Sequence, residues 1–284
     1  MHIYLLFIRI VKKIKMKKKI LLAVVISSTL LWGCKDDETA PKKSGSSSSI
    51  EIKEINMGLY AKLTATWCGP CGAWGWDLNE EISESTKNNA ISASIYGSAS
   101  SKMSNETAIQ FANDFGVKGW PSFTFNGKNR TEYSESGGIF PTTTKSNIEN
   151  ASSDFASSSV QMGVGGNISI EGNTLKLDWA AKAFKDQTGS FKIGAYILED
   201  NVIEEQAGKT GNVAHHHVLR DKMTIDFYGD DFEGVLSAGT TTNLSSLTYS
   251  LDESWNKDNI EVIGIIWKMN SSGGYDFVNA ARFN

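Results

Sequence analysis

The chain of 284 residues has only three cysteines, too few for the disulfide framework of a small secreted scaffold. It also has only four prolines, and its hydrophobic share of 40% and charged share of 21% exclude a collagen-like repeat, an acidic disordered chain and a polytopic membrane protein. At roughly 150 residues per domain, the length predicts two domains that can each bury a core.

Acidic residues outnumber basic ones, 32 against 28, which gives a net charge of −4. Residues 1–33 contain seven basic residues and no acidic one, so the remaining chain has 21 basic against 32 acidic residues and a net charge of −11. Such a chain has no overall attraction for phosphate backbones, and no local basic patch stands out. We therefore expect no nucleic-acid partner.

Residues 1–33 are typical of a bacterial export signal. Residues 17–19 are three lysines, and residues 20–32 form an uncharged run of 13 residues, too short to cross about 30 Å of hydrocarbon comfortably. The run leads into Leu31-Trp32-Gly33-Cys34, which resembles the bacterial lipobox. The resemblance implies that Cys34 is lipidated and anchors the protein to a membrane. The alternative is ordinary signal cleavage that leaves Cys34 as a free thiol.

Residues 34–49 are predicted to hold the lipidated cysteine and a flexible tether. Lys35-Asp36-Asp37-Glu38 resembles the lysine-plus-acidic tag that accompanies export of Bacteroidetes lipoproteins to the outer cell surface; the alternative is a solvated charge run. Residues 39–49 are rich in Pro, Lys, Gly and Ser. We expect an exported lipoprotein of the outer membrane, and the tag implies exposure at the cell surface.

Residues 50–155 alternate between strand and helix patterns. Trp74, Leu78 and Ile82 recur every four residues, which predicts an amphipathic helix with Trp74 in the core. A second helix is predicted to start at a Ser104 cap. The predicted order β-α-β-α-β-β-α includes strands at 58–66, 90–96 and 122–125, a hairpin turn at 126–127, and helices at 71–87, 104–115 and 142–155.

Two cysteines three positions apart, Cys68 and Cys71, stand at the start of the first helix. In a regular helix such positions lie about 5–6 Å apart at Cβ, but a disulfide needs about 3.5–4.5 Å, so Cys68 must occupy the non-helical cap. There, unpaired N–H groups and the helix dipole stabilise a thiolate, with a pKa of about 7 or lower. Cys68 is the predicted nucleophile and Cys71 the resolving thiol, while Pro70 is tolerated in the first turn and stiffens the loop.

Three alternative roles for the cysteine pair are less favoured. A zinc site needs four ligands, and no second CxxC or close His pair lies in this part of the chain, so we expect no metal. A structural disulfide that closes a four-residue loop constrains the unfolded chain very little. Two reduced, buried cysteines would not need Gly69 and Pro70 between them. Thiol–disulfide exchange with protein thiols or disulfides is therefore favoured, and we expect no cofactor.

The segment Trp67-Cys68-Gly69-Pro70-Cys71 matches the thioredoxin active-site motif, and Gly119-Trp120-Pro121 resembles the thioredoxin cis-proline loop. The resemblance covers residues 50–155 and implies a thioredoxin-like α/β domain. It also implies that Pro121 is cis, packs beside Cys68 and belongs to a loop that offers backbone groups to a substrate peptide.

Two residues depart from the thioredoxin pattern. Lys62 stands where a buried acidic residue is usual; protonated, it would favour thiolates, and neutral, it could act as a base. Trp120 stands where a small aliphatic residue or Thr is common. Trp76 and Trp120 are candidates for lining a peptide groove, with core packing as the alternative for each. The predicted substrate-binding residues are Trp67, Gly69, Pro70, Trp76 and Trp120.

Residues 160–284 show strand patterns and few helix signals. Alternating apolar residues on both sides of Glu171-Gly172-Asn173 predict a hairpin. His215 and His217 would share one face of a strand, and a polar sheet surface is favoured there over a metal site. Neither a nucleophile–His–acid triad nor a phosphate-binding loop is visible in the sequence. Further strands are predicted at 191–198, 213–220, 247–251, 260–267 and 275–282.

The fold class expected from these patterns is an α/β thioredoxin-like domain at 50–155 followed by an all-β, immunoglobulin-like sandwich at 160–284. The whole layout, with His216-His217-Val218-Leu219-Arg220 in its second part, resembles the outer membrane protein 28-related lipoproteins of Bacteroidetes. That resemblance implies an outer-membrane location and no defined reaction.

The sequence predicts an envelope-anchored thiol–disulfide oxidoreductase that acts on protein disulfides through the CGPC motif, with the direction of exchange open. The alternative is an outer-membrane surface lipoprotein that serves as a binding or structural module with a little-used thioredoxin fold. The expected partners are protein thiols or disulfides and a membrane, reached through the lipid anchor. No pattern in the sequence defines the oligomeric state.

Overall fold

The structure is a computed structural model that describes residues 49–232 and 236–283. The predicted signal segment 1–33 and nearly all of the predicted tether, Cys34 included, lie outside the described residues. The described residues belong to one compact unit, Ser48–Asn284. None of its described helices is long and apolar enough to cross a membrane.

The strands and helices predicted for residues 50–155, which we call the first half, are present, with one interruption. The helix expected at 71–87 is broken at Ala73, whose φ of −77° and ψ of −110° are not helical. The elements are β1 (Gly58–Leu63), α1 (Gly69–Gly72), α2 (Trp74–Thr86), β2 (Ala90–Ile95), α3 (Glu106–Asp114), β3 (Ser122–Phe125), β4 (Lys128–Asn129) and α4 (Pro141–Ser157).

Strands dominate residues 160–284, which we call the second half. The hairpin predicted around Gly172 joins β5 and β6. The strand predicted at 213–220 is interrupted, because the backbone of His217 has a φ of 51°, outside the β region. The elements are β5 (Met162–Glu171), β6 (Thr174–Ala183), β7 (Phe191–Glu199), β8 (Val202–Glu205), β9 (Asn212–His215), β10 (Val218–Lys222), β11 (Asp230–Phe232), β12 (Thr241–Asn243), β13 (Leu247–Ser250), the 3-10 helix η1 (Lys257–Asn259), β14 (Ile260–Met269) and β15 (Tyr275–Arg282).

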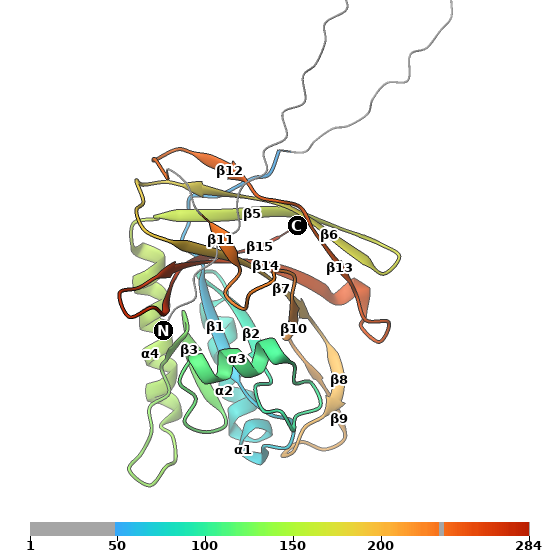
Figure 1. Ribbon diagram of the computed structural model, residues 1–284. Helices are drawn as coiled ribbons and strands as arrows, with labels where there is room; N and C mark the ends of the chain where they lie inside the picture. Colours follow the sequence, from blue (N-terminus) through green and yellow to red (C-terminus); the bar gives the residue numbers. More distant parts are fainter. Residues whose placement is uncertain (1–48, 233–235, 284) are drawn as a thin grey trace, which may run out of the picture. The chain divides into compact units, whose positions relative to one another are not determined.

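One sheet of nine strands runs through both halves of the chain (Figure 1). Its order is β15-β14-β7-β10-β2-β1-β3-β4, and β11 pairs with β7. Within the first half, β1 is parallel to β2 and antiparallel to β3. The second half joins at β2, where Val218 pairs with Ser94 and the His217 carbonyl accepts the Ser94 N–H at 2.8 Å.

The fold class predicted from the sequence is therefore wrong. The described residues have more strand than helix, and β1, β2 and β3 do not form a separate α/β thioredoxin-like domain, because they share a sheet with β7, β10, β14 and β15. The physical reason lies in β2, which is buried almost throughout and pairs along its second edge with a strand more than a hundred residues later. Apolar periodicity identifies a strand but does not identify its partner.

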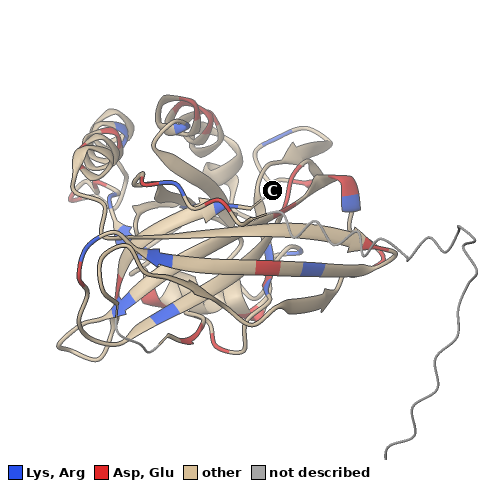
Figure 2. Ribbon diagram, turned by 90° about the horizontal axis from the view of Figure 1, so that it is seen from above, with Lys and Arg blue, Asp and Glu red and all other residues tan. Residues whose placement is uncertain are grey.

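A smaller sheet of four strands, β12-β6-β13 with β5 beside β6, forms a second layer above the large sheet (Figure 1). Leu177 and Trp179 of β6 share a buried core with Ile193 and Ile197 of β7. The outward face of β6 bears charges of both signs, which are interspersed rather than separated (Figure 2). The β-rich half thus packs as two layers, one of which continues into the first half.

Helices cover both faces of the first-half strands. On one face, Leu78 and Ile82 of α2 and Ile148 of α4 pack against Tyr60 and Phe123. Trp74 is 38% exposed, so its predicted core role is wrong. The buried positions of α2 are instead those of Gly75, Leu78, Ile82 and Thr86.

The helix α3 covers the opposite face and joins the two halves. Its N-cap is Asn105 rather than the predicted Ser104, and the Asn105 Oδ1 accepts the Ala108 N–H at 2.9 Å. The same side chain donates from Nδ2 to the Leu219 carbonyl of β10 at 2.7 Å. Asn105 therefore caps a first-half helix and holds a second-half strand.

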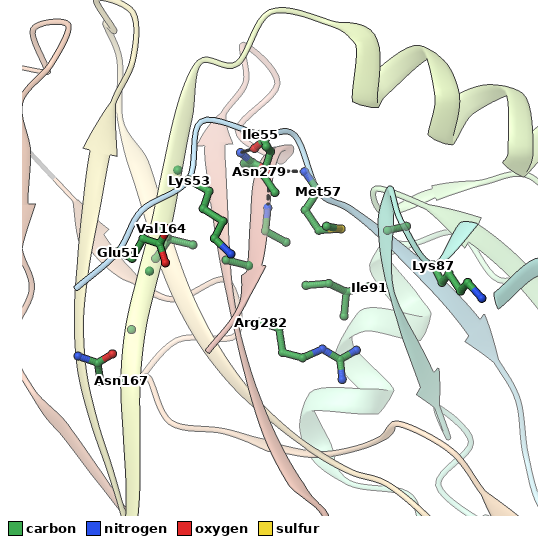
Figure 3. A pocket seen from close by; sticks show the side chains of 16 residues that line it. Glu51, Lys53, Ile55, Met57, Lys87, Ile91, Val164, Asn167, Asn279 and Arg282 are labelled. Atoms are coloured by element: carbon green, nitrogen blue, oxygen red, sulfur yellow. Dashed lines mark hydrogen bonds between the residues drawn. The ribbon is translucent and has the colours of Figure 1, made fainter. Parts of the chain in front are cut away.

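Asn279 of β15 fastens the segment that precedes β1, and it is only 1% exposed. Its Nδ2 donates to the carbonyls of Ile55 and Met162 at 2.9 and 2.7 Å, and its Oδ1 accepts the Met57 N–H at 2.8 Å. The bonds to Ile55 and Met57, which Figure 3 shows, border a hollow of about 260 Å³ that Lys53 also lines. The polar contacts hold the start of the described chain against its end.

Phe111 of α3 lies at the centre of the core that the two halves share. It is 2% exposed, and its ring centroid lies 5.3 Å from that of Tyr196 and 6.4 Å from that of Trp267. The Trp267 indole N–H donates to the Tyr196 hydroxyl at 3.2 Å. The rings of β7 and β14 thus pack directly on a first-half helix.

We predict that Phe111→Ala lowers the free energy of unfolding by about 3–5 kcal/mol, because it leaves a cavity between the halves. Urea unfolding should still show one transition at a lower midpoint. Phe140→Ala is the matched control, since Phe140 is 51% exposed and its loss should change stability little. Two separate transitions in the Phe111→Ala variant would contradict a shared core.

Candidate functional site

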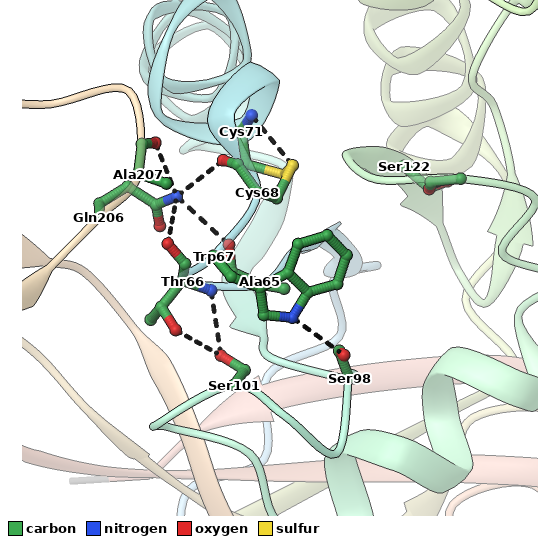
Figure 4. The surroundings of a disulfide bond; sticks show 11 residues. Ala65, Thr66, Trp67, Cys68, Cys71, Ser98, Ser101, Ser122, Gln206 and Ala207 are labelled. Atoms are coloured by element: carbon green, nitrogen blue, oxygen red, sulfur yellow. Dashed lines mark hydrogen bonds between the residues drawn. A yellow bond between two sulfur atoms is a disulfide. The ribbon is translucent and has the colours of Figure 1, made fainter.

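Cys68 and Cys71 are joined by a disulfide, with their Cα atoms 5.3 Å apart (Figure 4). Cys68 is the extended N-cap of α1, as the spacing argument requires, and Cys71 lies within the helix. The Cys71 backbone N–H donates to Cys68 Sγ at 3.2 Å. The turn therefore places one sulfur against a backbone donor at the start of a helix.

Both sulfurs are shielded, although the chain beside them is exposed. Cys68 is 3% exposed and Cys71 is fully buried, and Ala65 and Trp120 pack with them. Trp67 is 51% exposed, and its indole N–H donates to the Ser98 Oγ at 3.2 Å. Of the other motif residues, Pro70 is exposed and Gly69 is half-buried.

The Trp120–Pro121 peptide bond is cis, as the resemblance of the loop implied. Pro121 packs against α2 at Gly75, where an added Cβ would lie 2.7 Å from Pro121 Cγ. Trp120 borders the cysteine cluster. The structure thus brings together four of the predicted site residues, namely Cys68, Cys71, Trp120 and Pro121.

The loop between β8 and β9 completes the surroundings of the disulfide. Gln206 is 3% exposed, and its Nε2 donates to the carbonyls of Cys68 at 3.0 Å and of Ala65 and Thr66 at 3.2 Å (Figure 4). The Ala207 N–H donates to the Thr66 carbonyl at 2.8 Å. No pattern in the sequence points to Gln206, because a lone amide in a polar loop gives no local signal.

Two glycines allow this loop to lie directly on the CGPC turn. A Cβ on Gly72 would lie 2.1 Å from the Ala207 carbonyl oxygen. Gly208 has a φ of 90°, and a Cβ there would lie 2.4 Å from the Gly69 carbonyl oxygen. Any side chain at Gly72 or Gly208 would force the two backbones apart.

Trp76 lies in a cluster of charged and polar side chains. The ammonium groups of Lys62 and Lys209 lie 4.9 and 5.2 Å from its ring centroid, and the His215 ring stands edge-on at 5.3 Å. The Trp76 indole N–H donates to the Glu80 carboxylate at 2.6 Å. A substrate that used this ring would have to share it with these groups.

His215 is 1% exposed, so the predicted polar sheet surface is wrong for this residue. Its Nε2 lies 3.2 Å from the Glu204 carbonyl, which can only accept, so Nε2 carries the proton and Nδ1 accepts from the Tyr96 hydroxyl. Burial lowers the pKa of His215 to about 4. The ring is therefore neutral at pH 7 and serves as a fixed polar link between β9 and its neighbours.

His216 and His217 each lie within hydrogen-bond distance of a carboxylate. His216 Nδ1 lies 2.8 Å from Asp200, and His217 Nδ1 lies 3.2 Å from Glu261. Across the described ranges, no group of three or more His, Cys, Asp or Glu side chains is arranged to hold a metal ion.

Lys62 is buried at the strand end that precedes the CGPC turn. It is 3% exposed, and burial lowers its pKa to about 8, with Glu80 acting in the opposite direction. In the unfolded chain Lys62 keeps its proton up to about pH 10.5. Burial of the charged ammonium therefore lowers the free energy of unfolding most below pH 8, and this free energy should rise between pH 8 and 10.5.

We predict that Lys62→Met raises the free energy of unfolding at pH 7 by about 1–3 kcal/mol and removes its rise between pH 8 and 10.5. Urea unfolding at pH 7, 8.5 and 10 tests this. Lys176→Met, at an exposed position of β6, is the matched control and should leave the pH profile unchanged. Equal pH slopes for Lys62→Met and the unmodified chain would refute the assigned pKa.

Comparisons with known proteins place these features in context. The profile of the family described as Outer membrane protein Omp28 matches residues 108–280, a range that begins after Cys71 and contains Pro121 and Gln206. Among solved structures, HBP35 of Porphyromonas gingivalis superposes with a TM-score of 0.61 and 17% identity, covering 82% of this chain and 76% of that one. At this identity the likeness concerns the fold alone.

Two other solved structures match much more weakly. The E. coli curli protein CsgC has a TM-score of 0.23 at 10% identity and covers 44% of this chain and 97% of its own. R. palustris CsgH has a TM-score of 0.19 at 10% identity and covers 43% of this chain and 89% of its own. Neither supports an argument about this chain. Comparison with curated protein sequences gives no match.

Proposed function

Because the chain belongs to the Outer membrane protein Omp28 family, it is an outer-membrane protein of the cell envelope, and we propose that it exchanges thiols and disulfides there through Cys68 and Cys71. The relation to the outer membrane protein 28 family and the outer-membrane location, both predicted from the sequence, are confirmed by the family match. The exchange reaction is supported by the geometry around the two sulfurs.

One observation carries the proposal: the Cys71 N–H points at Cys68 Sγ across the bonded pair. When the disulfide opens, the same N–H can donate to a Cys68 thiolate, and such a bond lowers a thiol pKa. The break at Ala73 leaves α1 with only four residues, so the dipole of a long helix contributes less than the sequence implied. Local N–H groups would supply most of the stabilisation.

The reaction needs only the two cysteines and a substrate disulfide. The Cys68 thiolate attacks one substrate sulfur and forms a mixed disulfide, and the other substrate sulfur leaves as a thiolate that takes up a proton. Cys71 loses its proton and attacks Cys68 Sγ, which releases the first substrate sulfur as a second thiol. The two electrons of the cysteine pair reduce the substrate, and the Cys68–Cys71 disulfide forms. The reverse sequence oxidises a substrate dithiol.

The surface beside the turn suits a protein substrate. Trp67, which precedes α1, and Trp74, which begins α2, are 51% and 38% exposed and offer apolar contact area. Cys68 itself is nearly covered. We therefore expect exchange with disulfides on protruding, extended segments rather than with disulfides inside folded domains.

In the same proposal Cys34 carries the lipid, and its thioether leaves Cys68 and Cys71 as the only exchanging sulfurs of a chain with three cysteines.

A second candidate function is a binding or structural module at the outer membrane. The contacts of Gln206 favour it, because its amide bonds to three carbonyls of the turn and would make the disulfide part of a fixed support. The family match, which starts after Cys71, agrees with a role that does not use the sulfurs. This candidate predicts unchanged ligand retention in a Cys68→Ser variant.

We predict that Cys71→Ser captures protein partners as mixed disulfides through Cys68, because the residue that would release them is gone. Intact cells that express this variant should yield new high-mass species on non-reducing gels that disappear on reduction. The matched control is Cys68→Ser, which keeps one thiol of the pair but lacks the proposed nucleophile and should yield none.

Equal yields from the Cys71→Ser and Cys68→Ser variants, or no captured species from either, would refute exchange through Cys68. If both variants also retained the stability and the envelope phenotype of the unmodified protein, the disulfide would have neither a catalytic nor a structural role. Loss of stability in both variants without capture would favour the structural module.

A further inference from the structure

We propose that an open hollow beside α4 binds a neutral oligosaccharide. The hollow has a volume of about 600 Å³ and lies between α4, the β3–β4 hairpin and β15. We call it the α4 hollow. Neither Cys68 nor Cys71 lines it, so the proposal does not depend on the exchange reaction. Its charged residues are Lys128, Arg130, Glu132, Asp154 and Asp276, and Asn147 and Asn150 are among its amides.

One wall is a polar face of α4. Asn147, Asn150 and Asp154 are three and four positions apart in sequence, and in a helix this spacing places them on the same side. Asn147 donates from Nδ2 to the Arg130 carbonyl at 3.4 Å, while Asn150 and Asp154 are exposed. The helix therefore presents the Asn150 amide and the Asp154 carboxylate toward the hollow, in addition to Asn147, whose amide already bonds within the protein.

The facing walls bring further side chains that the protein itself does not pair. Arg130 Nε is buried and has no hydrogen-bond partner among the residues that the structure describes. A buried donor left unpaired costs about 1–3 kcal/mol, and an acceptor in the hollow removes that cost only if the half-buried Arg130 side chain turns to expose Nε. Asp154 and Asp276 form no ion pair with Lys128 or Arg130 within the described residues, although all four line the same hollow.

Aromatic rings form the apolar part of the hollow. Phe125 is 2% exposed, and the half-buried Phe155 and Phe277 lie beside it. The ring centroids of Phe125 and Phe155 are 6.2 Å apart, and those of Phe155 and Phe277 are 5.6 Å apart. The C–H face of a sugar ring can pack on the exposed parts of Phe155 and Phe277 while its hydroxyls reach the polar walls.

The mixture of charges selects the class of ligand. Glu132, Asp154 and Asp276 would repel a polyanion, and Lys128 and Arg130 would repel a cation. Hydroxyl groups both donate and accept, so a neutral polyhydroxylated chain can satisfy amides, carboxylates and cations together. The hollow is open, and an extended oligosaccharide can pass through it without being enclosed.

The test is binding of the full-length protein to an array of neutral and acidic glycans, followed by calorimetric titration with the neutral hexasaccharide that gives the strongest signal. We expect neutral glycans to bind and polyuronates to bind at least tenfold more weakly. The double variant Asn150→Ala/Asp154→Ala should raise the dissociation constant at least tenfold. Ser153→Ala, at an exposed position of the same helix that does not line the hollow, is the matched control and should bind like the unmodified chain.

Absence of binding to every neutral glycan, preference for acidic glycans or for a peptide, or unchanged affinity in the double variant would each overturn the proposal. Circular dichroism of both helix variants confirms that α4 is intact. The Cys68→Ser/Cys71→Ser variant should bind the glycan with unchanged affinity. That result would separate a failure of this proposal from a failure of the exchange reaction.

Discussion

The packing of Phe111 on Tyr196 and Trp267 is the contact on which the rest of the structure depends. It buries a helix of the first half against two central strands of the second, and the pairing of β10 with β2 continues the sheet across the same junction. Because the halves are held in this way, the loop that carries Gln206 lies on the CGPC turn. The surroundings of Cys68 are therefore built from residues nearly 140 positions apart.

Local patterns in the sequence predict the elements well and their assembly poorly. The helical stripe of Leu78 and Ile82 and the hairpin at Gly172 depend on neighbours in sequence, so periodicity and turn residues suffice to find them. The partner of β2 depends on which distant strand best covers its second edge, and no local pattern records that choice. Unusual backbone conformations are not visible in the sequence either. His217, for example, adopts a left-handed conformation that divides one predicted strand.

The candidate site divides in the same way. The cysteine spacing places Cys68 at the helix cap, and the Trp-Pro pair marks the loop that packs beside it. Gln206 could not be predicted from the sequence, because its role comes from long-range hydrogen bonds to backbone carbonyls. Every residue has such a carbonyl, so the sequence of the turn does not mark them as partners. The α4 hollow shows a related limit: Asn150 and Asp154 resemble an ordinary solvated helix face until Arg130 and Asp276 are seen across from them.

Native-state hydrogen exchange in increasing urea tests the shared core most directly. If one core holds both halves, the most protected amides of β1 (Gly58–Leu63) and β14 (Ile260–Met269) should open with the same free energy and the same dependence on urea. Opening free energies that differ by more than about 2 kcal/mol, with separate urea slopes, would mean that the halves unfold independently and would contradict the account.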